Sequence, residues 1–338
     1  MVETWKTLRR LGDGVYGPLE LRRDEVSGKL ITAQHIVKVK VKRKDYLWLS
    51  QFPRLIGHHS HLVEIFDVHQ GADGIRWELE YFRFGNLVDY IPSHCGLDES
   101  RAKSCITQLS SAIDYMHSLS LVHGDLCAEN VLVCDPEMKV VKLSGFCHAR
   151  KEGEITSKNT ENIPYMPPEI VQKLPTEGFS AHRSQDSWSF GILLFCMLNG
   201  SFPWTEAEKE SNKDYQRFYQ WHKHHTIHLS CSWTRFSNKL LKLLRKLIHP
   251  KQSKRTSISN VKKYIKFTWT RTEDDIDLTE DFRSSGCTGE DGASGSSGST
   301  TNLTAKLETL GVCTNGARQW RKVRTELWVS ASSDTNYL

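Results

Sequence analysis

The sequence predicts an α+β fold with two lobes, in which a small antiparallel sheet with one helix precedes a larger, mainly helical lobe. Residues 5–81 form short runs separated by glycine, proline and other turn-forming residues, a pattern typical of strands. From residue 85 onward, apolar side chains recur every three or four positions, as in helices that pack on a core. We expect the first lobe over about residues 5–82 and the second over about 83–268.

Five strands and one helix are expected in the first lobe. The segment LRRLGDGVYGPLELRR predicts two strands joined by a glycine-rich turn, and residues 30–41 predict a third strand. Residues 43–57 carry a helical pattern that Pro53 is expected to interrupt. Residues 61–68 and 75–81 predict the last two strands.

Three segments of the second lobe are clearly helical. Residues 100–119, 185–198 and 239–248 each place their apolar side chains on a buried face or, in the second case, all around. We expect this lobe to end near Trp269.

The rest of the chain, residues 269–338, is predicted to be a flexible tail. It is acidic between residues 271 and 281 and rich in glycine and serine between 284 and 300. Basic residues and tryptophans in residues 318–329 fit either a docking peptide or a poorly ordered end.

The composition excludes several classes of protein. With 38% hydrophobic and 25% charged residues the chain is typical of soluble globular proteins, and its net charge of +5 does not indicate a nucleic-acid partner. The nine cysteines are scattered and lack a C-x-x-C pair, which indicates reduced thiols in a cytosolic or nuclear protein, and we place it in the cytoplasm. The longest apolar run, residues 190–198, is too short to span a membrane, so we expect no membrane partner. The histidine clusters have no standard zinc spacing, and we expect no metal site.

Several motifs occur in a fixed order along residues 5–268. Gly12, Gly14 and Gly17 form G-x-G-x-x-G between two strands, and residues 123–130 have the spacing H-x-D-x-x-x-x-N. Further on come the segments M-P-P-E and D-S-W-S-F-G, and a single arginine near the end of the lobe. In this order and spacing the chain resembles a eukaryotic protein kinase, and within that superfamily it is most similar to the SH3-binding kinase group.

The resemblance implies an intact scaffold. His123 and Phe146 would stack in a hydrophobic spine that joins the lobes. Asp186 would begin the long buried helix, and Glu169 would form a buried salt bridge with Arg255. An adenine slot is also implied. Its expected lining comprises Leu19, Ala33, Leu79, Leu132 and the hinge residues Glu80 to Phe82.

The charged positions of the family pattern are replaced. His35 stands where the lysine of the third strand is expected, Lys38 would point to the opposite face, and no acid lies near Ser50 to pair with either. Cys127 replaces the lysine of the catalytic loop, and Gly145 replaces the metal-binding aspartate of D-F-G. Asp125, the expected base, and Asn130, a second metal ligand, remain as vestiges.

The sequence therefore predicts a catalytically inactive kinase-like protein, a pseudokinase that acts as a scaffold or regulator through an unknown protein partner. No cofactor is required, although weak ATP binding without magnesium fits the adenine slot. One alternative is a weakly active serine/threonine kinase that uses Asp125 as base, and another is a small-molecule binding module. Cys127 and Cys147 face the expected cleft, where inert thiols are favoured over a redox role.

Overall fold

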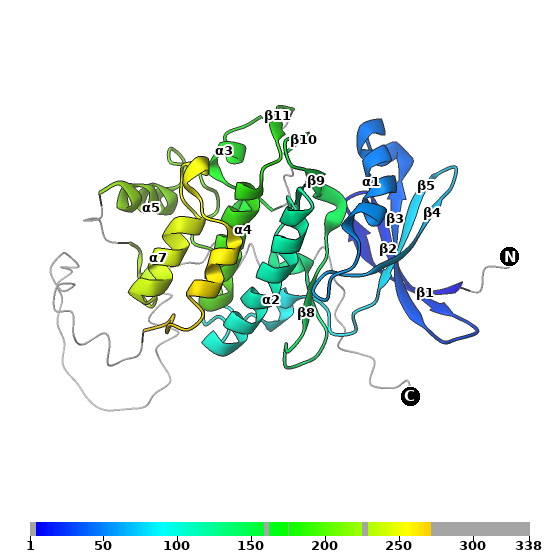
Figure 1. The fold of residues 1–338 in the computed structure, drawn as a ribbon, viewed down its shortest axis with the longest axis horizontal. Coiled ribbons are helices and arrows are strands. Elements are labelled where there is room, and N and C mark those ends of the chain that lie inside the picture. Colours follow the sequence, from blue (N-terminus) through cyan, green and yellow to red (C-terminus); the bar gives the residue numbers. More distant parts are fainter. Residues whose placement is uncertain (1–4, 159–161, 175, 225–228, 272–338) are drawn as a thin grey trace, which may run out of the picture.

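A computed structural model describes residues 5–158, 162–174, 176–224 and 229–271, which form two lobes side by side (Figure 1). The smaller lobe is a five-stranded antiparallel sheet in the order β1-β2-β3-β5-β4. Its strands are β1 (Trp5–Gly14), β2 (Gly17–Asp24), β3 (Leu30–Val37), β4 (Ile65–Gln70) and β5 (Gly74–Glu80). The predicted α+β fold with a five-stranded first lobe is confirmed.

One helix, α1 (Arg43–Ile56), packs on this sheet, and two details of the prediction are wrong here. Pro53 does not interrupt the helix, because Trp48, Leu49, Phe52 and Ile56 are buried along one face and this packing outweighs the lost backbone hydrogen bond. The third strand ends at Val37 rather than at residue 41. Lys38 therefore leaves the sheet, and its Nζ lies 5.7 Å from the centre of the Tyr46 ring.

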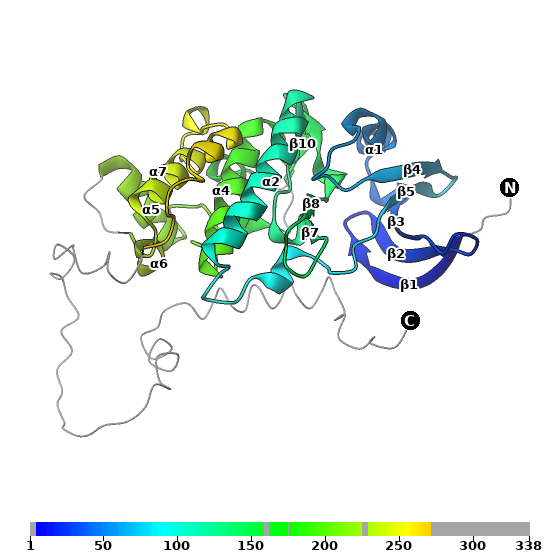
Figure 2. The same ribbon diagram turned by 60° about the horizontal axis from the view of Figure 1, so that its bottom comes forward.

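The larger lobe surrounds α4 (Arg183–Asn199), of which fifteen residues are buried. A helix that is apolar on nearly all sides belongs at the centre of a lobe. Around it lie α2 (Glu99–Ser118), α3 (Pro168–Val171), α5 (Lys213–His224), α6 (Cys231–Thr234) and α7 (Asn238–Leu247) (Figures 1 and 2). Gly200 ends α4 with a left-handed φ of 68°, where a Cβ would lie 2.2 Å from the Pro92 carbonyl oxygen.

Three two-stranded sheets carry the loops of the larger lobe toward the smaller one. They pair β6 (Leu121–Val122) with β9 (Arg150–Lys151), β7 (Val131–Val133) with β8 (Val141–Leu143), and β10 (Ile155–Ser157) with β11 (Gly178–Ser180). The segment between β6 and β7 and the segment between β8 and β9 thereby face each other at the boundary of the lobes. These two segments hold four of the expected site residues, His123, Asp125, Asn130 and Phe146.

The described chain remains packed on the larger lobe as far as Arg271. Trp269 is fully buried, and its backbone N–H donates to Glu99 on α2 at 2.9 Å. The expected tail from residue 272 onward lies outside the described residues. In the parts of the chain that the structure describes, no helix has both the length and the apolar character needed to cross a membrane.

Candidate functional site

A cavity of about 520 Å³ lies between the lobes. Its volume is within the usual range of small-molecule pockets, about 300–1,000 Å³. Many of the residues expected from the sequence line it: Gly12, Gly14, Leu19, Leu79, Glu80, Phe82, Asp125, Asn130 and Leu132. Gly17, Ala33 and His35 are expected site residues that do not line it, and β3 explains two of these differences.

The side chains of β3 face the opposite way from the sequence-based expectation. Thr32 and Gln34 line the cavity, whereas Ala33 and His35 lie on the other face of the sheet. His35 Nε2 is 3.2 Å from Glu20 Oε2 there. Because strand side chains alternate, a shift of one residue exchanges the two faces. Gln34 therefore occupies the position that the resemblance assigns to the lysine, and its amide donates to Cys147 Sγ at 3.2 Å.

Gly17 lets the glycine-rich loop pack closely against β3. A Cβ on Gly17 would lie 2.6 Å from the carbonyl oxygen of His35, so only glycine lets the loop approach β3 this closely. Tyr16, at the tip of the loop, is partly buried, and its ring centre lies 6.4 Å from that of His148. The tip thus rests close to the segment that follows Gly145.

Asn130 fills the space beside Gly145. A Cβ on Gly145 would lie 2.3 Å from Asn130 Cγ, 2.4 Å from its Nδ2 and 2.5 Å from its Oδ1. Gly145 also has a φ of 83°, which disfavours other residues. A carboxylate at this position would therefore require Asn130 to move. Among the described residues, no three histidine, cysteine, aspartate or glutamate side chains converge to hold a metal ion.

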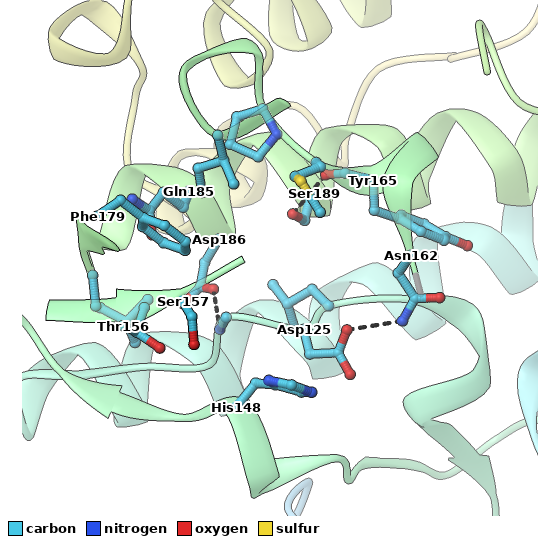
Figure 3. Close-up of a pocket in the computed structure, with 17 residues that line it drawn as sticks. Asp125, His148, Thr156, Ser157, Asn162, Tyr165, Phe179, Gln185, Asp186 and Ser189 are labelled. Atoms are coloured by element: carbon cyan, nitrogen blue, oxygen red, sulfur yellow. Dashed lines mark hydrogen bonds between the residues drawn. The ribbon is translucent and has the colours of Figure 1, made fainter. Parts of the chain in front are cut away.

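Asp125 is held by two amides, and Figure 3 shows the one from Asn162. Asn130 Nδ2 donates to Asp125 Oδ2 at 2.9 Å and to the Asp125 carbonyl at 2.8 Å. Asn162 Nδ2 donates to Asp125 Oδ1 at 2.8 Å. Both carboxylate oxygens thus accept hydrogen bonds from neutral side chains of the protein, which is a satisfied arrangement for a carboxylate at a cavity wall.

The two cleft thiols are buried and protonated at neutral pH. Burial raises the pKa of Cys147 to about 12 and raises that of Cys127 well above its usual value. Burial also raises the pKa of the neighbouring Glu129. A thiolate is the reactive form of cysteine, so neither thiol is an activated nucleophile. Among the described residues, the charged groups that act on Cys127 are the acids Asp125 and Glu129, so no cation takes the place of the family's lysine there.

An ion pair between Asp45 and Arg150 ties α1 to the larger lobe. Asp45, in the first turn of α1, accepts a hydrogen bond from Arg150 Nη2 at 2.8 Å. Trp48 Nε1, one turn later, donates to the Ala149 carbonyl at 2.6 Å. The Arg150 side chain is only 3% exposed. This pair fixes α1 without the strand lysine and helix glutamate of the family pattern.

An aromatic column connects the lobes beneath the cavity. The ring centres of His123 and Phe146 are 5.9 Å apart, those of Phe146 and Phe52 are 5.5 Å apart, and those of Phe52 and Trp77 are 6.0 Å apart. Burial lowers the pKa of His123, so the ring is neutral and suited to this packing. His123 and Phe146 therefore lie in contact, but edge to face at an interplanar angle of 66° rather than stacked.

Asp186 anchors the start of the catalytic-loop segment. Its Oδ2 accepts from the His123 backbone N–H at 2.8 Å and lies 2.8 Å from His117 Nε2, and its Oδ1 accepts from the Gly124 N–H at 2.9 Å. Burial by itself would raise the pKa of Asp186, but the hydrogen bond with His117 and the other hydrogen bonds outweigh it and lower the pKa. The carboxylate stays charged and holds the loop in place.

Glu169 and Arg255 form the expected ion pair. The two guanidinium nitrogens donate to the two carboxylate oxygens at 2.7 and 2.6 Å. The Arg255 side chain is completely buried, and its guanidinium carbon lies 4.8 Å above the Trp188 ring. The pair fixes α3 on the larger lobe.

Sequence reasoning missed four residues of the site. These are Gln34, Asp45, Arg150 and Asn162. A signal existed for Asn162, since it lies seven residues before Glu169, at a fixed spacing from a motif that was identified. The partners Asp45 and Arg150 are 105 positions apart, and no local pattern connects them.

Comparisons with known proteins agree with this architecture. A family model described as "Protein kinase domain" matches residues 5–267. The chain is 34% identical to serine/threonine-protein kinase SBK1 of Danio rerio over 272 residues, which cover 78% of this chain and 69% of that protein. It is 32% identical to SBK1 of Mus musculus, covering 79% and 64%. It is 30% identical to serine/threonine-protein kinase SBK2 of Rattus norvegicus, covering 85% and 80%.

Proposed function

The chain belongs to the protein kinase domain family, and from that premise we propose that it is an inactive member, a pseudokinase that acts as a scaffold or regulator by binding another protein. The observation that carries the proposal is the position of Asn130. Its side chain fills the space that a metal-binding carboxylate at Gly145 would need. The residues present therefore do not fit the magnesium ion that phosphoryl transfer in this family uses.

The electrostatics of the cavity support the same function. Phosphoryl transfer depends on cations that neutralise the phosphate groups and on exact positioning. The strand position holds the neutral Gln34, and the catalytic-loop position holds the neutral thiol of Cys127. Removing one preorganised electrostatic group typically costs about 10²–10³ in rate. Such losses do not simply multiply, but together they leave little room for turnover.

The parts of the domain that maintain its shape support binding as the remaining role. The aromatic column through His123 and Phe146, the Asp186 hydrogen bonds and the Glu169–Arg255 pair are all in place. The chain thus keeps the shape of the domain while its charged chemistry is replaced. A cytoplasmic location also belongs to this proposal. It is supported by the seven cysteines in the described part of the chain, none of which forms a disulfide there.

A weakly active serine/threonine kinase is the second candidate, favoured by Asp125 and the glycine-rich loop. We expect purified wild-type protein to give no phosphotransfer above the rate measured without protein, because Gly145, Gln34 and Cys127 supply neither a magnesium carboxylate nor a phosphate-binding cation. The measurement is the transfer of labelled γ-phosphate from ATP to the protein itself and to a general substrate protein. Asp125→Ala should behave like the wild type, and Asp214→Ala, at an exposed position on α5, is the matched control. Turnover that Asp125→Ala abolishes and Asp214→Ala preserves would refute the inactive assignment.

ATP binding without turnover is part of the proposal. The adenine side of the cavity keeps Leu19, Leu79 and Leu132 together with the backbone of the hinge. With no metal carboxylate at Gly145, we expect weak stabilisation by ATP of equal size in magnesium and in a chelator. Thermal unfolding across an ATP titration measures it, since a ligand that binds the folded state raises the midpoint. Strong stabilisation that appears only with magnesium would contradict the expectation.

A further inference from the structure

The net charge of +5 conceals a strong separation of charge along the chain. Residues 215–272 contain no aspartate or glutamate, and they contain fourteen lysines and arginines. The next nine residues, 273–281, contain six acids. A block of one sign followed at once by a block of the other is a pattern of charges that can pair with each other.

The structure collects part of the basic block on one face. Lys239, Lys242 and Lys246 follow one side of α7 at helical spacing and are exposed, while the leucines of the opposite side are buried. The segment after α7 adds Lys266. Lys239 Nζ and Lys266 Nζ lie 5.0 and 5.3 Å from the centre of the same Phe267 ring. We call these four lysines the basic face. In both ribbon views α7 lies beside the gold segment that follows it in the chain (Figures 1 and 2).

The described residues supply no carboxylate to the basic face. None of its four lysines forms an ion pair within the described parts of the chain. Glu99 is the acid that contacts residues 269 and 270, and both of its carboxylate oxygens already have partners. Its Oε1 pairs with Lys103 at 2.7 Å, and its Oε2 accepts from the Trp269 and Thr270 N–H groups. Lys242 and Lys246 are four residues apart on one helix, where like charges repel.

We propose that the acidic segment 273–281 of the same chain docks on the basic face. The geometry favours this occupant, because the described chain ends beside the first residues of α7. The Arg271 N–H donates to the Arg235 carbonyl at 2.8 Å, and the Ser237 N–H donates to the Trp269 carbonyl at 2.8 Å. The acids therefore begin two residues from a point fixed next to the helix.

The segment is long enough to cover the face. Residues 272–281 can extend over about 33 Å, at about 3.3 Å per residue. The ten residues of α7 span about 15 Å, at 1.5 Å per residue. A tether this short gives an effective concentration in the millimolar range, so the attached acids outcompete a free acidic peptide of equal intrinsic affinity. Docking in cis masks the basic face from polyanions such as nucleic acid.

The full-length protein tests the proposal through zero-length carbodiimide crosslinking, which joins carboxylates and amines in direct contact. We expect crosslinks from residues 273–281 to Lys239, Lys242, Lys246 and Lys266, identified by mass spectrometry. They should disappear near 1 M salt, where the Debye length is about 3 Å. Mixing light and isotope-labelled chains should show that the crosslinks form within one chain.

Charge variants provide the controls. Lys239→Glu, Lys242→Glu and Lys246→Glu together should abolish the crosslinks to α7 and to Lys266. Replacing the six acids of residues 273–281 with lysine in this triple variant should restore the crosslinks, now between lysines of the segment and glutamates of α7. Lys6→Glu, Lys40→Glu and Lys151→Glu together change the net charge equally at exposed positions elsewhere and should change nothing. The proposal is overturned if the acids crosslink equally to lysines across the surface, or if only chains of different label are joined, which would indicate docking between copies.

Discussion

Replacing Arg255 with alanine should lower the free energy of unfolding by about 3–5 kcal/mol, the usual cost of removing one partner of a buried ion pair. The change leaves the Glu169 carboxylate, whose side chain is 27% exposed, without its partner. It also removes the hydrogen bonds that Arg255 Nε and Nη1 donate to the His249 and Ser184 carbonyls at 2.9 and 3.2 Å. Urea unfolding at equilibrium measures the loss as a shift of the midpoint at constant slope.

Lys254→Ala is the matched control for this experiment. Lys254 is the preceding residue, and it is exposed, so its loss should change the free energy of unfolding by no more than about 0.5 kcal/mol. Hydrogen exchange should show the largest loss of protection in α3, which carries Glu169. If Arg255→Ala costs no more than Lys254→Ala, the ion pair does not hold the larger lobe together.

The features predicted correctly from the sequence are those that local patterns determine. The five-stranded lobe follows from turn residues placed between short strands, and α4 follows from an apolar run of helical length. His123 with Phe146 and Glu169 with Arg255 are pairs that the resemblance to protein kinases implies, and each pair lies in contact. Where a motif links two distant residues, the sequence predicts their contact.

The facing of β3 could not be predicted from alternation, because this strand is covered on both faces. Ile31, Ala33 and Ile36 are buried, and so is Thr32, so the strand shows no clear division into an inner and an outer side. An error of one position then exchanges Gln34 and His35. The correction places the uncharged amide of Gln34 at the cavity wall, where the family pattern has a lysine.

The charge segregation near the end of the larger lobe was present in the sequence but hidden by averaging. The whole-chain balance of +5 gives no sign of a basic block and an acidic block that directly follow one another. Lys239 and Lys266 are 27 positions apart in the sequence, and only the structure shows that both contact the Phe267 ring. Net charge therefore describes the overall electrostatics of such a chain poorly, and the distribution along the sequence describes its surfaces better.

Replacing Gly145 with aspartate, which restores the carboxylate of the family pattern, should destabilise the protein rather than activate it. A residue with a Cβ at a left-handed φ costs about 1–3 kcal/mol. Contact at 2.3 Å with Asn130 adds overpacking of about 1–3 kcal/mol, so we expect a total loss of about 2–6 kcal/mol. Equilibrium unfolding in urea measures it.

Gly153→Asp separates the two contributions. Gly153 has a similar φ of 88°, but a Cβ there would meet no atom within 4 Å. This variant should show the cost of the backbone conformation alone, and Gly145→Asp should exceed it by the cost of displacing Asn130. On an Asn130→Ala background that excess should vanish, which a double-mutant cycle reports as a coupling of about 1 kcal/mol or more.

The comparison also decides how the inactive site is built. If Gly145→Asp costs no more than Gly153→Asp, then Asn130 moves freely and the space for a metal carboxylate remains available. The inactive assignment would then depend only on the neutral residues Gln34 and Cys127. If the excess appears and Asn130→Ala removes it, Asn130 itself blocks the position. Its hydrogen bonds to Asp125 would then hold the catalytic loop in a form that excludes the metal carboxylate.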